Sequence, residues 1–247
     1  MPSRSICLIT GGSGTIGSAI AKSLVAGGVA RKVFLTGRSL AKLEQASARL
    51  GSTNKDVVHC LPCDVTNERS VEDLFTAIDE QTGCHVDLLI NNAGINCFGA
   101  TVDLSAHDFR RVMDTNVLGP FLCSREAMKR MIAAGTGGRI INIGSLSASS
   151  PRPDSAPYTT SKFALKGLTT SLALDGRAHN IAVGIIHPGN VESELLTEEV
   201  IAERQREGFL PATHIAESVL HMAQLPYESN ILEMTVAPTP QPYVGRG

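Results

Sequence analysis

The chain has 247 residues, 43% of them hydrophobic, and a formal net charge of -2 at pH 7. Its length is enough for one large α/β domain or two small ones, and we expect a single domain over residues 1–247. The basic residues are scattered and no segment approaches the ~20 apolar residues of a membrane span, which argues against nucleic acid and membranes as partners. The first apolar run is too short for a signal peptide, so we expect a cytoplasmic protein.

Seven short β-branched runs alternate with helical patterns along the chain. The runs lie at 6–10, 32–36, 57–61, 87–91, 139–143, 181–186 and 232–236. The helical patterns lie near 15–28, 39–50, 67–81, 106–134, 158–178 and 212–224. This alternation predicts an α/β, Rossmann-like, doubly wound parallel sheet of about seven strands with helices on both faces. Pro62 fits an edge strand, which is the place of the third strand in the order 3-2-1-4-5-6.

The stretch "TGGSGTIG" at residues 10–17 stands between the first predicted strand and its helix. In such a sheet, backbone N–H groups and the helix N-terminus at this turn bind a pyrophosphate, and glycines let the backbone approach it closely. The expected contacts come from this stretch: Gly11, Ser13, Gly14, Thr15, Ile16 and Gly17. An ordinary strand-to-helix turn is the alternative.

A second pattern is "YTTSK", in which Tyr158 and Lys162 are four residues apart and therefore share one face of the predicted helix. Ser145 ends the strand that precedes this helix. Each residue also has an ordinary interpretation: Tyr158 and Lys162 as an exposed helix pair, Ser145 as a helix cap and Asn116 as part of a polar turn.

Taken together, the motifs resemble the short-chain dehydrogenase/reductase family from about residue 5 to residue 237. The motifs are "TGGSGTIG", "CDV" (63–65), "NNAG" (91–94), "DTN" (114–116), Ser145, "YTTSK" and "HPGNVES" (187–193). One departure is Thr15, which stands where many family members of this length have glycine. The spacing is instead similar to that of the longer, extended members, and it leaves the phosphate contacts of this loop open.

The resemblance implies hydride transfer between a nicotinamide and a carbonyl or alcohol, with Asn116, Ser145, Tyr158 and Lys162 as the catalytic set. In reduction, the carbonyl oxygen becomes alkoxide-like and needs a hydrogen-bond donor and then a proton. Ser145 would be the donor and Tyr158 the acid. Lys162 would lower the pKa of Tyr158 for the reverse reaction, and Asn116 would support a proton relay.

The resemblance also implies cofactor contacts that follow the strands. Tyr158 and Lys162 belong to both sets, because lysine also suits the ribose hydroxyls. The further expected contacts are Asp64 and Val65 at the adenine, Asn92, Ala93 and Gly94 at its ribose, and Pro188, Gly189, Val191 and Ser193 at the carboxamide end. Asp64 could instead be the N-cap of the following helix.

The choice of dinucleotide depends on Gly37 and Arg38, at the end of the second strand. An acidic residue there would bind the ribose 2′-hydroxyl of NAD and repel the 2′-phosphate of NADP. The chain has glycine followed by arginine, which can grip a phosphate bidentately, so the cofactor is expected to be NADP(H). A solvated Arg38 at the helix start is the alternative.

We expect a small-molecule carbonyl or alcohol as substrate, held between the Ser/Pro-rich loop 145–157 and the charged helical insertion 191–211. Leu146, Leu195, Leu196 and Phe209 would offer apolar surface and Arg152 an anion contact, although all could equally be packing residues. No metal is expected, because Cys60 and Cys63 form the chain's single CxxC pair and lie in a strand.

The family resemblance also implies a homodimer or homotetramer, formed through the long helices and the C-terminal tail. Two rival functions stay open: an epimerase or dehydratase on the same scaffold, and a dinucleotide-sensing protein without turnover.

Overall fold

The structure is a computed structural model, and it describes residues 5–51, 56–192 and 198–243. One parallel sheet runs through it in the order β3-β2-β1-β4-β5-β6-β7. The strands are β1 (Ser5–Thr10), β2 (Ala30–Gly37), β3 (Val58–Pro62), β4 (Leu88–Asn91), β5 (Gly138–Ile143), β6 (Ile181–Pro188) and β7 (Glu233–Val236). The predicted fold class is confirmed, and Pro62 ends β3 at the edge of the sheet, as its missing N–H requires.

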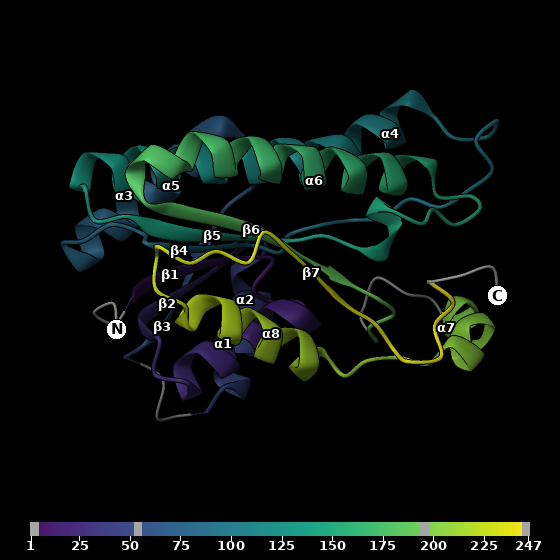
Figure 1. Ribbon diagram of the computed structural model, residues 1–247, viewed down its shortest axis with the longest axis horizontal. Helices are drawn as coiled ribbons and strands as arrows, with labels where there is room; N and C mark the ends of the chain where they lie inside the picture. The colour runs from purple at the N-terminus through teal and green to yellow at the C-terminus, as the bar shows by residue number, and fades with distance from the viewer. Residues whose placement is uncertain (1–4, 52–55, 193–197, 244–247) are drawn as a thin grey trace.

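Helices cover both faces of this sheet (Figure 1). The helices are α1 (Thr15–Ala26), α2 (Leu40–Arg49), α3 (Glu68–Thr82), α4 (Ala106–Met113), α5 (Gly119–Ala134), α6 (Ala156–Gly176), α7 (Glu198–Arg204) and α8 (Ala212–Gln224). One buried cluster packs α3, α5 and α6 on the upper face in Figure 1, and a second packs α1, α2 and α8 on the lower face. Within the described residues, none of these helices is long and apolar enough to cross a membrane.

The helix expected over 106–134 is interrupted by a π-helical turn at Asp114–Leu118. Gly119 donates its N–H to the carbonyl of Asp114, five residues earlier, which is the π pattern. Pro120 explains the break: it has no N–H to donate to the carbonyl of Asn116, four residues earlier. The periodicity of the apolar residues predicts a helix here but does not reveal this change of register.

A buried polar network fixes the helices of the upper face against the sheet. Asn91 donates from Nδ2 to Oδ1 of Asn142 (2.8 Å) and to Oγ of Ser124 on α5 (3.0 Å). Asn142 in turn donates to Oγ1 of Thr169 on α6 (2.8 Å). All four side chains are buried, where an unpaired amide would cost about 1–3 kcal/mol. The network therefore specifies how α6 sits on the sheet, with its first turns at the carboxyl end of the strands.

Candidate active site

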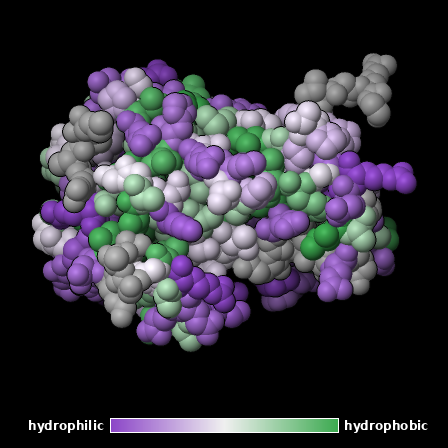
Figure 2. Space-filling model, turned by 90° about the horizontal axis from the view of Figure 1, so that it is seen from below, coloured by the Kyte–Doolittle hydropathy of each residue, from purple (hydrophilic) through white to green (hydrophobic). Residues whose placement is uncertain are grey.

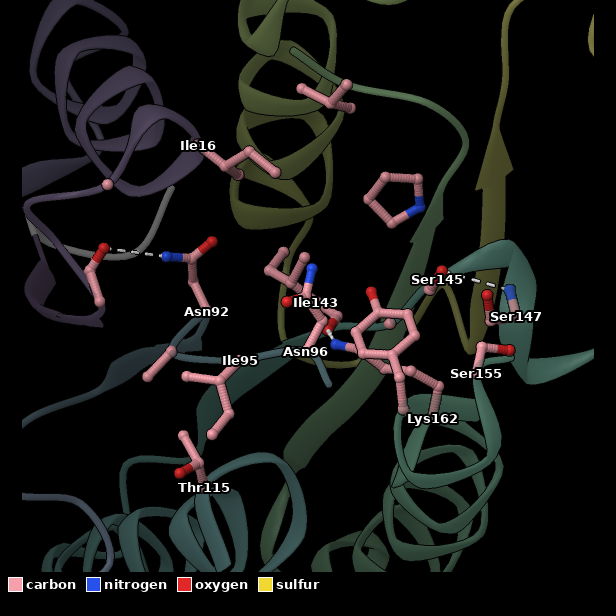
Figure 3. Close-up of a pocket in the computed structure, with 18 of the residues that line it drawn as sticks. Ile16, Asn92, Ile95, Asn96, Thr115, Ile143, Ser145, Ser147, Ser155 and Lys162 are labelled. Atoms are coloured by element: carbon pink, nitrogen blue, oxygen red, sulfur yellow. Dashed lines mark hydrogen bonds between the residues drawn. The ribbon is translucent and has the colours of Figure 1, made fainter. Parts of the chain in front are cut away.

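A cavity of about 940 Å³ lies at the carboxyl ends of the strands. The ends of several strands, α7 and the C-terminal segment all contribute to its walls. In open parallel sheets of this type, ligands bind at this edge. Figure 3 shows part of the lining, with Ile16 on one side of the cavity and Ser145 and Lys162 on the other.

The glycine loop forms one wall of the cavity. Gly11 has a φ of +64°, and a Cβ there would lie 2.9 Å from the Cα of Ala93, so the position requires glycine. Gly14 is the N-cap of α1, and Ser13, Gly14, Thr15 and Ile16 line the cavity together with Gly11. Gly17 does not line the cavity; it lies behind the loop, where a Cβ would overlap the carbonyl oxygen of Gly11. Its role is close packing of α1 against the loop.

Asn92 holds the glycine loop to the end of β4. Its Nδ2 donates to the carbonyls of Thr10 (3.0 Å) and Gly11 (3.1 Å), and the Thr10 hydroxyl accepts from the backbone N–H groups of Asn92 and Ala93. Asn92, Ala93 and Gly94, which the sequence predicts as cofactor contacts, all line the cavity. The same contacts show that Asn92 supports the loop as well as facing the cavity.

The ends of β2 and β3 form the next part of the wall. Arg38, before the N-cap of α2, is exposed and lines the cavity together with Lys42 in the first turn of that helix; sequence reasoning does not single out Lys42. Asp64 and Val65 line the same region. Asp64 accepts hydrogen bonds from Thr66, whereas Asn67 caps α3, so the alternative interpretation of Asp64 as the N-cap is wrong.

The lining is positively charged although the chain as a whole has a net charge of -2. Among the described residues, the lining contains seven basic residues and only three acidic ones. The basic residues are Arg38, Lys42, Arg110, Arg111, Arg152, Lys162 and Arg204, and the acidic residues are Asp64, Asp114 and Glu207. Such a cavity attracts an anionic ligand.

Ser145, Tyr158 and Lys162 meet at the end of β5 and the start of α6, and all three line the cavity. The ammonium of Lys162 lies 5.5 Å from the centre of the Tyr158 ring, and it donates to the carbonyl of Ile143 (2.9 Å). Ser145 also accepts from the N–H of Ser147 (3.2 Å), so the cap interpretation is correct as well, without excluding a role in the cavity (Figure 3).

Burial controls the pKa values of both titratable groups. It raises the pKa of the Tyr158 phenol, while hydrogen bonding from Ser145 and the charge of Arg204 act in the opposite direction. Burial lowers the pKa of Lys162 to about 8. The lowering of the Tyr158 pKa by Lys162 that is expected from the sequence is therefore not seen in the polypeptide alone: the pKa of the phenol is raised, because a buried phenolate loses its hydration.

The side chain of Asn116 does not line the cavity. It is buried in the π-helical turn, where Oδ1 accepts from the N–H of Ile95 (2.8 Å) and Nδ2 donates to the carbonyl of Ile95 (2.9 Å) and to Ser161 (2.9 Å). Ser161 donates in turn to the carbonyl of Tyr158 (2.7 Å). Asn116 thus braces both the loop after β4 and the first turns of α6.

Pro188 ends β6, and it lines the cavity together with Gly189 and Val191; the sequence predicts all three as cofactor contacts. Ser193 lies outside the described residues. The structure places a polar neighbour, Asn190, among them, which sequence reasoning missed because nothing in the local pattern marks it.

Asn190 belongs to a cluster at the mouth of the cavity. Arg152 forms a bidentate pair with Glu207, to which Asn190 also donates (2.9 Å), and Gln241 bonds to Asn190. The anion contact expected of Arg152 is therefore made inside the protein, by Glu207. Leu146 lines the cavity, Phe209 is half-buried outside its lining, and Leu195 and Leu196 lie outside the described residues.

Replacing Lys162 by methionine should raise the stability of the protein. The pKa of Lys162 is depressed, so its burial penalty is complete near pH 7 and is relieved as the pH rises through about 8 toward the unfolded-state pKa. Lys162→Met removes a penalty of about 3 kcal/mol and loses one hydrogen bond, so we expect Tm near pH 7 to rise by about 2–8 °C. The gain should shrink above about pH 9.

The matched control is Lys166→Met, one turn further along α6, where an exposed lysine pairs with Glu233 (2.7 Å). A surface pair of this kind contributes about 0–1 kcal/mol, so Tm should hardly change. Differential scanning calorimetry checks both variants. A lower Tm for Lys162→Met than for the wild type near pH 7 would show that the buried ammonium stabilises the fold.

Comparison with known proteins gives one family. Residues 5–204 match the family described as short chain dehydrogenase. A 3-oxoacyl-acyl-carrier-protein reductase of Rickettsia typhi is 36% identical over 203 residues, covering 82% of this chain and 78% of its own. A farnesol dehydrogenase of Aedes aegypti is 32% identical over 241 residues, covering 94% and 95% of the two chains.

Solved structures agree with this match. A variant of actinorhodin polyketide ketoreductase with NADPH has a TM-score of 0.87 at 28% identity, covering 97% of this chain and 98% of its own. The closed form of serine dehydrogenase complexed with NADP+ has a TM-score of 0.88 at 26% identity, covering 98% of both chains. With the family match over most of the chain and the Ser145, Tyr158 and Lys162 cluster in its cavity, the protein belongs to the short-chain dehydrogenase/reductase family of oxidoreductases.

Proposed function

We propose that the protein is an NADP-dependent oxidoreductase that interconverts a carbonyl compound and a secondary alcohol. The observation that carries this proposal is the meeting of Ser145, Tyr158 and Lys162 in the cavity that the glycine loop also lines. A hydrogen-bond donor, a proton donor and a buried cation are the groups that carbonyl reduction needs, and they stand beside a wall suited to a dinucleotide.

The residues present fit NADP(H). The glycine loop at the N-terminus of α1 suits the pyrophosphate, and Arg38 with Lys42 suits a 2′-phosphate at the end of β2. Further predicted contacts that line the same cavity lie at the ends of β3, β4 and β6: Asp64, Val65, Asn92, Ala93, Gly94, Pro188, Gly189 and Val191. Two of the compared structures contain NADPH and NADP+, which supports the choice. When bound, the cofactor supplies or accepts the hydride at its nicotinamide ring.

In the direction of reduction, Ser145 donates a hydrogen bond to the carbonyl oxygen, and Tyr158 delivers the proton that the forming alkoxide takes up. The raised pKa of Tyr158 suits this task, because the phenol then stays protonated at neutral pH. A donor aimed at an oxygen on which negative charge develops stabilises the transition state more than the ground state.

In the direction of oxidation, Tyr158 must act as a base, and Lys162 makes this possible. An ammonium 5.5 Å from the ring stabilises a phenolate by about 3 kcal/mol at an effective dielectric constant of about 20. The positive charge of an oxidised nicotinamide would act in the same direction. The balance between burial and these two charges then sets whether Tyr158 holds or releases its proton.

Asn116 is the fourth member of the proposed set. Its side chain fixes the turn of α6 between Tyr158 and Lys162 through Ser161, and its carbonyl has lost its α-helical donor at Pro120. We assign it to the proton route on the Lys162 side, as a residue that positions that route. The catalytic pair therefore depends on the π-helical turn as well as on α6.

A homo-oligomer is also part of the proposal. Several large apolar side chains on α5, α6 and the turn between α4 and α5 are exposed: Leu118, Phe121, Ile132, Phe163 and Leu174. The opposite face, which Figure 2 shows over α1 and α8, instead mixes hydrophilic and hydrophobic residues. Exposed apolar surface on two neighbouring helices suits association with a second copy. A cytoplasmic location, expected from the sequence, remains a prediction.

Removing the Tyr158 hydroxyl should lower the rate of ketone reduction without changing the binding of NADPH. We expect Tyr158→Phe to bind NADPH as the wild type does, since only a hydroxyl is lost, but to turn over a ketone at least about 100-fold more slowly. The control is Tyr227→Phe, because Tyr227 lies beside Gly137, just before β5, at the opposite end of that strand from Ser145. NADPH consumption and fluorescence titration measure the two properties. Turnover near the wild-type rate in Tyr158→Phe would refute its role as acid.

The end of β2 should decide the choice of dinucleotide. We expect a kcat/KM with NADPH about ten- to a hundredfold above that with NADH, and a reversed preference in Gly37→Asp/Arg38→Leu. The aspartate has room, because a Cβ at Gly37 would meet only Leu43, at 3.7 Å. Arg49→Leu, on the exposed side of α2, is the control that should leave the ratio unchanged. A wild type that already prefers NADH would refute the role of Arg38.

A further inference from the structure

His187 lies directly behind Ser145, at the end of β6, and only 2% of it is exposed. Its Nδ1 is 2.8 Å from the carbonyl oxygen of Ser145 and 3.2 Å from the backbone nitrogen of the same residue. The ring packs closely on Gly144, where a Cβ would come within 2.5 Å of Nδ1. Gly144 is therefore required by the imidazole rather than by the backbone conformation.

This contact lies where the backbone pairing between β5 and β6 ends. The pairing of β5 with β6 ends at Ile143, and Gly144 makes the last backbone bond to β6, to the carbonyl of Ile186 (2.6 Å). Ser145 follows in extended conformation, before the short turn at Leu146–Ala148. Its backbone N–H faces the imidazole of His187 instead of a strand carbonyl. A side chain thus replaces the sheet at the residue whose hydroxyl must be placed for the reaction.

Charged groups surround the other side of the ring. Nε2 of His187 lies 3.4 Å from Oε1 of Glu233 on β7, and Glu233 pairs with Lys166 on α6. Burial lowers the pKa of His187, and the charges of Lys166 and Lys162 add to that effect, while the Ser145 carbonyl and Glu233 act against it. The imidazole is therefore neutral at pH 7, and its Nδ1 can accept from the N–H of Ser145 or, in the other tautomer, donate to its carbonyl.

We propose that His187 is a positioning residue, which as a neutral imidazole fixes the backbone of Ser145 so that the serine hydroxyl stays beside Tyr158. This inference rests on the function proposed above for Ser145. Protonation of His187 removes the lone pair that Nδ1 offers to the Ser145 N–H and leaves the Ser145 carbonyl as the partner of Nδ1, so the backbone position of Ser145 changes in acid.

Two substitutions test the contact itself. His187→Leu fills much of the same space without a polar atom, and we expect kcat for ketone reduction to fall about ten- to a hundredfold, while the Kd for NADPH stays unchanged. His187→Asn places an amide near the position of Nδ1, so it should restore most of kcat. Equal losses in both variants, or a normal kcat in His187→Leu, would overturn the inference.

The pH profile separates positioning from mere packing. Wild-type kcat should fall in acid, below the usual histidine pKa of about 6.5, and His187→Asn should lack this fall. Glu233→Gln removes a charge that favours the imidazolium, so it should move the fall to lower pH, whereas Lys166→Met should move it to higher pH. An acid limb that is identical in all four proteins would contradict the role of His187, even if His187→Leu does not fold.

Hydrogen exchange makes the result independent of turnover. We expect the Ser145 amide to exchange more slowly in the wild type and in His187→Asn than in His187→Leu, with no change at the amides of β4. This readout remains decisive if no ketone is reduced, a result that would refute the proposed function alone. Equal exchange at Ser145 in all three proteins would refute the contact alone.

Discussion

The site is arranged around the buried ammonium group of Lys162 and its contacts with β5 and Tyr158. Its Nζ is held by the carbonyl of Ile143, at the last paired residue of β5, and it lies 5.5 Å from the Tyr158 ring. Burial opposes the charges of both groups, as their shifted pKa values show. A charge kept at this cost exerts a stronger effect on its neighbour than one in water, because the local dielectric constant is low.

The surroundings of Lys162 can be understood as supports for this arrangement. The network of Asn91, Asn142 and Thr169 sets the place of α6 on the sheet, and Asn116 with Ser161 braces its first turns. At Ser145, where the strand pairing has ended, Nδ1 of His187 contacts the backbone in its place. These contacts come from three strands (β4, β5 and β6), the π-helical turn and α6, which are distant from one another in the sequence. The precise geometry of the site is thus a property of tertiary packing rather than of the "YTTSK" motif itself.

Much of the architecture could be predicted from the sequence, because it depends on local patterns. Alternating β-branched runs and helical periods indicate the parallel sheet, and Pro62 indicates its edge. The glycine loop could be predicted in the same way, since Gly11 needs a positive φ and a close approach to Ala93. The π-helical turn could not, because apolar periodicity hardly changes when one hydrogen bond shifts by a residue.

The residues at the mouth of the cavity show most clearly what cannot be predicted from the sequence. Arg152 suggests an anion site in the sequence, but the fold brings Glu207 to it from 55 positions away. A pattern of residues cannot reveal that a charge is neutralised by a distant segment. For the same reason the sequence gives no sign that Asn116 turns its side chain away from the cavity, or that His187 reaches Ser145.

The central claim is that Tyr158 exchanges its proton under the control of nearby positive charge, and a spectroscopic titration of tyrosine tests it most directly. The chain has three tyrosines and no tryptophan, so tyrosinate absorbance can be followed without indole interference. On saturation with NADP+, one tyrosine should titrate about two pKa units or more below its value in the protein alone, and Tyr158→Phe should lack this transition. If NADP+ binds and no tyrosine changes its pKa, the account of Tyr158 as an acid and base controlled by Lys162 and the nicotinamide is wrong.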